Sequence, residues 1–404
     1  MVYDLIVVGS GACGIMASIN AASNNNKVLL LEQQSKLAQK LKATGGGRCN
    51  LTNTLPQEQF ISKFGKNGRF MVDVLDYFSN EDLIDFFKSI GVQTHQPDGF
   101  RVFPITHNSS TIIDALKLEL NRKSIEVKYN SLVKDITKHN NIFTVELEDI
   151  KYLAKNIVIA TGGLGYSNLG ASGDGYRFAS NLGHKVTNTY PAMMPLDTKE
   201  DWTQYCTADT IPKVKITVDI KKYKKLSAIG DLIFTKNGIR GPVVLDFARE
   251  ITPLFDKYEQ IPIILNMVKG KTQNDILKLF KQYPTNTIIE VLQHILPTSV
   301  IEQLLKIVEV DKNINFKKLQ GIKKEQLLNI ITNTPLTISG HSGFKLAMIT
   351  RGGVSLKDID PKTMQSKKVS GVYFCGEVVD IDGPCGGYNL QWAFSSGYLA
   401  GALK

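Results

Sequence analysis

The sequence predicts an α/β protein in which both ends of the chain form one parallel sheet with a small antiparallel meander. An inserted β-rich region followed by a helical region is expected between them. Short apolar strands ending in glycine turns occur near the start, at 156–163 and again at 372–376. The middle of the chain instead shows short strands separated by prolines, then helical periodicity. Because 404 residues exceed what one hydrophobic core supports, more than one domain is expected.

The first glycine turn has the full pattern of a Rossmann dinucleotide-binding unit. The apolar run Leu5 to Val8 precedes Gly9, Gly11 and Gly14, and an alanine-rich helix follows. The first glycine permits the tight turn, the second lets the backbone approach a pyrophosphate, and the third lets the helix pack on the strand. The helix N-terminus offers N–H groups to the phosphates. Glu32 ends the second strand and is placed to accept hydrogen bonds from a ribose 2′-hydroxyl, which disfavours NADP at this site.

A second glycine-rich loop, TGGGRCN (Thr44 to Asn50), follows where a plain NAD-binding fold enters its next helix. Its three glycines let the backbone lie close to a flat or charged surface. Arg48 offers a fixed fork of donors, and Asn50 offers both a donor and an acceptor. The loop therefore suits a cofactor that extends well beyond an adenosine half and whose remote ring needs backbone contacts. The alternative is a surface loop without a ligand. Cys49 beside Arg48 is in a setting that lowers a thiol pKa, but no resolving cysteine is near in sequence.

The C-terminal segment predicts a return to the first domain. A strand from Val372 to Cys375 is followed by Gly376-Glu377, a loop, Gly386-Gly387 and a helix from about Asn389 to Leu403. Small residues along this helix predict close packing against the first Rossmann helix. Its N-terminus forms an anion site, which favours a flavin ring that becomes negative on reduction. The alternative is a helix that serves only as a structural lid.

These patterns set the expected domains. Residues 1–190 and 341–404 form the discontinuous dinucleotide-binding domain, in which Asn140-Asn141 turns the meander and a helix begins at Asp174. The Asp174 carboxylate either caps that helix or faces the cofactor. Residues 191–270 and 334–340 form the inserted β-rich domain, and 271–333 the helical subdomain.

Composition restricts the function further. Five cysteines without a C-x-x-C pair, and no His/Cys cluster with zinc spacing, predict neither a disulfide framework nor a metal site. No signal peptide and no apolar run of about 18 residues occur, so a cytoplasmic protein without a membrane span is expected. The formal charge of +10 comes largely from lysine-rich stretches around 221–225 and 317–324. We interpret these lysines as solvated faces, because no nucleic-acid motif accompanies them.

With these motifs the sequence resembles the BaiN-like family of NAD(P)/FAD-dependent oxidoreductases, which includes aminoacetone oxidase-like enzymes. The resemblance covers essentially the whole chain, and its motifs are VVGSGACG, TGGGRCNLTN, DGFRVFP, IVIATGG, GASGDGY, YPAMMPL, GDLIFTKNGIRGP, KLAMITRGGVSLKDIDPKTMQSK and VYFCGEVVDIDGPCGGYNLQWAFSSG. The resemblance implies non-covalent FAD, with the second glycine loop serving its flavin half. It also implies that the inserted region is a β-barrel-like domain that carries a helical subdomain.

The resemblance also implies positions for the cofactor. Gly11, Cys13 and Glu32 touch the ADP half, while Val133 contacts adenine through its backbone. Gly46, Arg48, Cys49 and Asn50 lie along the pyrophosphate and flavin. The ribityl chain and ring are held by Glu377, Asp382, Gly387, Asn389 and Leu390. The complete predicted FAD-binding set is Gly9, Gly11, Ala12, Cys13, Gly14, Glu32, Gly46, Arg48, Cys49, Asn50, Val133, Thr161, Gly162, Glu377, Asp382, Gly387, Tyr388, Asn389 and Leu390.

The expected activity is hydride transfer between a small organic substrate and the flavin. The other redox partner is either a nicotinamide, NAD(P)H, or oxygen. No second complete G-x-G-x-x-G follows Gly163, so a nicotinamide is expected to bind only transiently. Arg351, Tyr388 and His341 are considered at the reactive face, but packing or loop hydrogen bonds explain each of them, and no catalytic residue is assigned.

Two alternatives from other classes stay open. The first is an RNA-modifying flavoprotein that acts on tRNA, which the basic charge permits. The second is a flavin-binding module without turnover. The sequence assigns neither the physiological substrate nor the oligomeric state.

Overall fold

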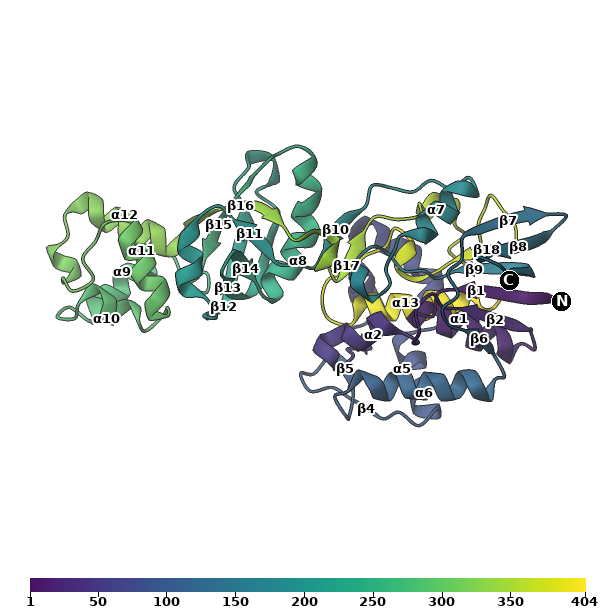
Figure 1. Cartoon of the computed structure of the whole chain (residues 1–404). Coiled ribbons are helices and arrows are strands. Elements are labelled where there is room, and N and C mark those ends of the chain that lie inside the picture. Colours follow the sequence, from purple (N-terminus) through teal and green to yellow (C-terminus); the bar gives the residue numbers. More distant parts are fainter. The chain divides into compact units, whose positions relative to one another are not determined.

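Both ends of the chain contribute to the first of two units in the computed structural model, which describes residues 1–404 (Figure 1). This first unit is made of Met1–Tyr190 and Ile349–Lys404, and the second of Pro191–Met348. The chain returns to the first unit later than the expected residue 341, because β16 (Thr334–His341) is still paired within the second unit, where His341 lies opposite Leu196. β10 (Tyr190–Ala192) contains the boundary between the units.

A seven-stranded sheet forms the centre of the first unit. Its strands are β1 (Val2–Val8), β2 (Val28–Leu31), β6 (Glu126–Lys128), β7 (Asp135–His139), β8 (Ile142–Glu146), β9 (Lys151–Ile159) and β18 (Val372–Phe374). The order is β6-β2-β1-β9-β8-β7, and β18 also pairs with β9. β6, β2, β1, β9 and β18 run parallel, whereas β7, β8 and β9 form an antiparallel meander. Leu5–Val8 of β1 and all of β2 are buried, in agreement with the unbroken apolar runs at these positions.

Helices cover this sheet, and the first and last helices pack directly against each other (Figure 1). A Cβ at Gly397 would lie 2.2 Å from the Cys13 carbonyl oxygen, and one at Gly401 would lie 2.3 Å from the Ala17 oxygen. Glycine therefore permits the close approach that the small residues predicted. The helices of this unit are α1 (Ala12–Ser23), α2 (Gln39–Ala43), α3 (Gln57–Ser62), α4 (Val72–Tyr77), α5 (Asn80–Ser89), α6 (Ser109–Arg122), α7 (Asp174–Asn181) and α13 (Tyr388–Ala400).

Short strands complete the first unit. β3 (Thr52–Asn53), β5 (Arg101–Pro104) and β4 (Thr94–His95) form a small sheet, in that order. β17 (Ile349–Arg351) begins the C-terminal part of the unit. At the predicted meander turn, Asn140 and Asn141 both have positive φ, 47° and 64°, which Asn tolerates better than most residues.

A closed barrel forms the β-rich part of the second unit. Its order is β11-β14-β13-β12-β15-β16, from β11 (Leu196–Thr198), β12 (Thr210–Val218), β13 (Ser227–Thr235), β14 (Gly238–Arg240) and β15 (Ile261–Asn266) with β16. Along β15, buried residues alternate with exposed or half-buried ones, so one face of the strand lines the core. The helices are α8 (Pro242–Ile251), α9 (Gln273–Gln282), α10 (Ile288–Leu292), α11 (Thr298–Ile307) and α12 (Gly321–Thr332).

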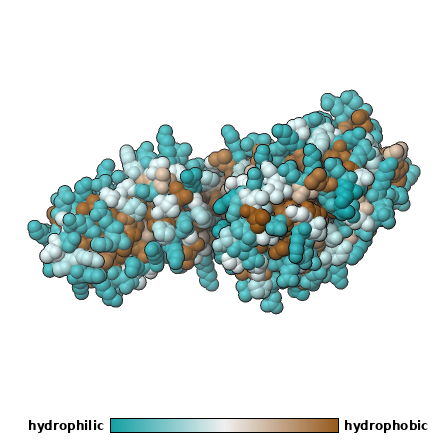
Figure 2. Space-filling view, turned by 90° about the horizontal axis from the view of Figure 1, so that it is seen from below, coloured by the Kyte–Doolittle hydropathy of each residue, from teal (hydrophilic) through white to brown (hydrophobic).

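The structure confirms the predicted fold class, a Rossmann-type parallel sheet with a meander plus an inserted β-barrel and helices. On the face shown in Figure 2, hydrophilic side chains surround smaller hydrophobic patches. No helix of the chain combines the length and the apolarity that crossing a membrane requires.

Candidate functional site

Two of the three glycines in the first glycine turn, Gly9 and Gly14, are tightly packed, and the third, Gly11, is open. Gly9 has φ +102°, and a Cβ there would lie 2.6 Å from the Ala160 oxygen. A Cβ at Gly14 would lie 1.9 Å from the Gly9 oxygen, so helix α1 packs directly on the turn. A Cβ at Gly11 would meet nothing within 4 Å. The open backbone at Gly11 and Ala12, where α1 begins without a side-chain cap, is the part of the turn that a phosphate can approach.

Glu32 follows β2 directly and is buried beside this turn. One carboxylate oxygen accepts hydrogen bonds from the Ser10 N–H at 3.0 Å and the Ser10 hydroxyl at 2.5 Å. The other accepts from the Gln34 N–H at 2.7 Å. These three donors leave part of the carboxylate's acceptor capacity free. They hold Glu32 at the position where a ribose is expected from the sequence.

The TGGGRCN loop contains η1 (Thr44–Gly47), in which Gly45, Gly46 and Gly47 have φ values of +59°, +66° and +86°. These left-handed values explain the glycine run, because glycine adopts them without strain. A Cβ at Gly46 or Gly47 would meet nothing within 4 Å, so both positions are open. The Arg48 guanidinium lies 5.6 Å from the centre of the Phe103 ring, and its Nε donates to the Gly45 oxygen at 3.2 Å.

Cys49 corrects one expectation from the sequence. The pKa of this thiol is raised to about 12, not lowered, because the side chain is fully buried and burial disfavours the thiolate. Arg48 is exposed, so its charge lies in solvent rather than beside the sulfur. Cys49 therefore acts as a packed core residue.

Asn50 connects this loop to the C-terminal helix. In the amide orientation that satisfies its neighbours, its oxygen accepts from the Gly387 N–H at 2.9 Å. Its nitrogen donates to the carbonyl oxygens of Thr52 and Val102 at 3.0 and 3.3 Å. Gly387 has φ +85°, and a Cβ there would lie 2.4 Å from the Thr52 carbonyl. The start of α13 is thus fixed against the second glycine loop.

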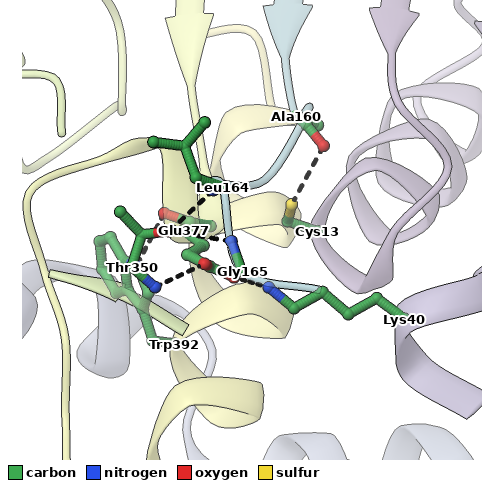
Figure 3. Close-up of polar contacts among 9 residues, drawn as sticks. Cys13, Lys40, Ala160, Leu164, Gly165, Thr350, Glu377 and Trp392 are labelled. Carbon is green, nitrogen blue, oxygen red and sulfur yellow. Dashed lines mark hydrogen bonds and ion pairs between the residues drawn. The ribbon is translucent and has the colours of Figure 1, made fainter. Parts of the chain in front are cut away.

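Glu377 lies in η10 (Gly376–Val378), at the centre of the polar contacts in Figure 3. One carboxylate oxygen lies 2.6 Å from Lys40 Nζ, and the other accepts from the Thr350 N–H at 2.8 Å. The Thr350 hydroxyl accepts from the N–H groups of Leu164 and Gly165 at 2.7 and 3.2 Å. Lys40 and Thr350 were not among the residues predicted from the sequence, because nothing local in either motif indicates a partner so far along the chain.

Gly376, next to Glu377, has φ +72° and is held from both sides by α13. Its carbonyl accepts from the Trp392 indole N–H at 3.0 Å, and its own N–H donates to the Ser396 hydroxyl at 2.9 Å. A Cβ at 376 would lie 2.5 Å from Cys13 Sγ. Cys13 is therefore buried between the first turn and the C-terminal segment (Figure 3).

The loop before α13 is ordered by Asn389. Its amide oxygen accepts from the Gly383 N–H at 2.8 Å, and its nitrogen donates to the Gly383 oxygen at 2.9 Å. Asp382 lies in the same loop, and Leu390 packs partly against the core. The buried Tyr388 ring lies 4.9 Å from Phe60, centre to centre, so its side chain belongs to an aromatic cluster.

Three further predicted positions follow strands of the main sheet. Thr161 and Gly162 come after β9, and the Cα of Thr161 packs on Gly9. The Thr161 hydroxyl is buried without a hydrogen-bond partner, and the space in front of Gly162 is open. Val133 is buried just after Ser131, whose N–H donates to the Glu32 carbonyl at 2.8 Å.

Of the residues considered for the reactive face, His341 belongs to the second unit. Its Nδ1 accepts from the Gly343 N–H at 3.1 Å, and its ring contacts Phe255. Burial lowers the pKa of His341. Arg351 ends β17 in the first unit.

The residues present fit FAD. The open glycine backbones at Gly11, Gly46 and Gly162, the buried carboxylate of Glu32 and the N-terminus of α13 all belong to the first unit. They supply close backbone approach, an acceptor for sugar hydroxyls and N–H groups for negative charge. No group of three or more His, Cys, Asp or Glu side chains forms a metal site.

Comparisons with known proteins agree with this architecture. The family described as HI0933-like protein Rossmann domain matches residues 3–403. The 3-dehydro-bile acid delta(4,6)-reductase of Clostridium scindens is 29% identical over 401 residues, covering 98% of this chain and 97% of that protein. The ribosomal RNA dihydrouridine synthases of Escherichia coli and Haemophilus influenzae are 28% and 29% identical over 400 residues, with 98% and 97% of this chain covered and 96% of each relative.

Solved structures share the fold at lower identity. The 3-ketosteroid delta1-dehydrogenase from Sterolibacterium denitrificans has a TM-score of 0.55 at 11% identity, covering 99% of both chains. The 3-ketosteroid-delta4-(5alpha)-dehydrogenase from Rhodococcus jostii has a TM-score of 0.53 at 15% identity, covering 100% of this chain and 97% of the other. The family match extends over nearly every residue and confirms the resemblance seen in the motifs: this chain belongs to the HI0933-like Rossmann family.

Proposed function

We propose that this chain is a FAD-dependent reductase that delivers a hydride to a carbon–carbon double bond conjugated with a carbonyl group. The electrons come from NAD(P)H, which binds transiently, and the substrate is a small organic molecule. The observation that carries this proposal is the family match over residues 3–403. It is joined by a relative named a delta(4,6)-reductase, which this chain matches over 97% of that protein's length. The dihydrouridine synthase relatives have names that also describe saturation of a ring double bond.

The protein's part in this chemistry is binding and electrostatics. FAD, when bound, supplies the hydride transfer. The open backbone at Gly11 and the start of α1 would bind the pyrophosphate, and Glu32 the adenosine ribose. The N-terminus of α13, fixed by Asn50, would place N–H groups where negative charge develops.

Three measurements on purified protein test the proposal. An absorbance spectrum near 450 nm reports bound flavin. Anaerobic stopped-flow mixing with NADH and with NADPH reports whether either bleaches that band. A 3-oxo-4,6-diene bile acid added to the reduced protein should reoxidise it faster than buffer alone.

Each result is decisive. Reoxidation by oxygen that outpaces every enone favours an oxidase. A flavin that no nicotinamide, amine or amino acid reduces favours a binding module without turnover. Protein that stays colourless after incubation with FAD removes the proposal.

A second candidate is dihydrouridine synthesis in RNA. Two relatives, 28% and 29% identical, carry that name for ribosomal RNA rather than for the tRNA considered from the sequence. The second unit also has exposed lysines on β12 and the segment after it, namely Lys213, Lys215, Lys221, Lys222, Lys224 and Lys225. Of their neighbours, Asp219 lies 3.8 Å from Lys224. Such a surface suits a phosphate backbone.

This candidate is tested by binding a ribosomal RNA fragment and a tRNA at two salt concentrations. Replacing Lys221, Lys222, Lys224 and Lys225 by Gln should reduce the salt dependence of log K by about 1 per lost phosphate contact. The matched control replaces four exposed lysines of the first unit, Lys36, Lys63, Lys88 and Lys117. Equal effects of the two sets, or no salt-dependent binding, argue against an RNA substrate.

A further inference from the structure

We propose that Lys40 is a positioning residue that fixes Glu377 and sets the charge balance at the flavin site. This inference rests on the proposed function, because it concerns how the chain prepares for FAD. Lys40 lies on α2, immediately before the TGGGRCN loop, and Glu377 lies immediately before the loop that leads to α13. Their ion pair, 2.6 Å between Nζ and Oε2, joins segments 337 residues apart (Figure 3).

The geometry leaves Glu377 little freedom. Its second oxygen accepts from the Thr350 N–H, so each carboxylate oxygen has a fixed donor. A Cβ at Gly163 would lie 2.5 Å from the Glu377 carboxylate and 2.4 Å from the Thr350 hydroxyl, so the cluster is closely packed on that side as well. Lys40 is the cation of this cluster.

The pair differs from the chain's surface ion pairs in burial. The side chains of Lys40 and Glu377 are 27% and 19% exposed, whereas Lys278 and Asp275 are 78% and 40% exposed. Exposed pairs contribute little, but removing one partner of a pair shielded from water leaves the other charge without compensation. The neighbouring Lys42 is exposed and therefore offers a control on the same short helix.

A charge argument gives the direction of the effect. Two-electron reduction makes the flavin negative, so a fixed cation nearby favours the reduced form, and an uncompensated carboxylate disfavours it. Without Lys40, the negative charge of Glu377 stands alone. The reduced cofactor is then destabilised more than the oxidised one, and the midpoint potential falls.

The test compares Lys40→Met, Lys40→Arg and Lys42→Met in the full chain. The readouts are the FAD midpoint potential, from equilibrium dye titration, and the dissociation constant of oxidised FAD. In Lys40→Met, the preference for reduced over oxidised FAD should fall at least about tenfold, which is about 30 mV for a two-electron couple. Lys40→Arg should recover more than half of that shift, and Lys42→Met should not differ from the wild type.

A second variant covers loss of the cofactor. Should Lys40→Met release FAD, Lys40→Met combined with Glu377→Gln should bind it again, because the unpaired charge is gone; failure to rebind overturns the proposal. Equal potentials in Lys40→Met and Lys42→Met also overturn it. A wild-type chain that binds no FAD removes the proposed function and this inference together, whereas normal binding with an unchanged Lys40→Met potential removes only the role of Lys40.

Discussion

Asn50 accepts a hydrogen bond from the backbone N–H of Gly387, at 2.9 Å, across most of the length of the chain. This contact fixes the N-terminus of α13 against the TGGGRCN loop, and the same amide group donates to Thr52 and Val102. The two glycine-rich segments thus form one surface of the first unit. These three hydrogen bonds give a structural role to Asn50, which needs both a donor and an acceptor.

Replacing Asn50 by leucine should destabilise the protein and weaken FAD retention. The buried Gly387 N–H loses its acceptor and the Thr52 carbonyl loses a donor, whereas the Val102 carbonyl keeps the Leu51 N–H. A buried group left unsatisfied costs about 1–3 kcal/mol. The measurements are the thermal midpoint and the ratio of absorbance at 450 and 280 nm after gel filtration. Asn50→Asp keeps the acceptor for Gly387, so we expect a smaller loss; wild-type flavin content in Asn50→Leu would contradict the prediction.

Gly11→Ala and Gly14→Ala should separate cofactor binding from folding. Alanine at 14 would overlap the Gly9 oxygen and should cost about 1–3 kcal/mol of stability. Gly11 has φ −72° and ψ −177°, which alanine adopts freely, and its front is open. The Gly11 variant should therefore melt like the wild type without FAD but bind FAD more weakly. Circular dichroism melts and FAD titrations compare the two, and equal stability of both variants would count against the assigned roles.

His184 should make stability fall below neutral pH. The ring is buried, and its Nδ1 lies 3.1 Å from the Ala179 oxygen. Ser366 accepts from two backbone N–H groups and so donates its proton to His184 Nε2, at 2.6 Å. Nε2 can take up the second proton of the ring only by giving up this hydrogen bond, and burial lowers the pKa of His184.

The sign of the pH effect follows. The unfolded chain binds a proton near pH 6.5, whereas the folded one resists it until lower pH. Stability is therefore full above about pH 6.5 and is lost as the pH falls through the folded pKa, by at most about 1.4 kcal/mol per pH unit for one proton. Urea melts of the wild type and His184→Gln between pH 8 and 5 measure the difference. Parallel pH profiles would refute the assignment.

Cys49 should resist alkylation while Cys385 reacts. The Cys49 pKa of about 12 leaves almost no thiolate at pH 8, and the side chain is buried. Cys385 is the exposed thiol of the five cysteines. Titration of native protein with a disulfide reagent should show one rapid thiol, absent in Cys385→Ser. A second thiol of equal rate that disappears in Cys49→Ser would contradict the burial argument.

Much of the fold could be predicted from the sequence, but the helices between Gln57 and Arg122 could not. The strand–turn–helix at Gly9 and the Asn140-Asn141 turn depend on local steric rules, and the structure has them where the sequence placed them. The helices from α3 to α6 were not predicted. α3 and α4 have six residues each and depend on packing against the rest of the first unit. α5 and α6 do carry local signals that could have identified them, namely the Ser79–Asp82 capping box and the Asn108 N-cap.

The sequence by itself determined where glycine is required and where Glu32 lies, because these follow from backbone geometry within a few residues. Only the tertiary structure decided that Lys40 pairs with Glu377, that Asn50 holds Gly387 and that Cys49 has a raised pKa. Those properties depend on which distant segments meet and on how much water remains between them. Local sequence carries no record of either.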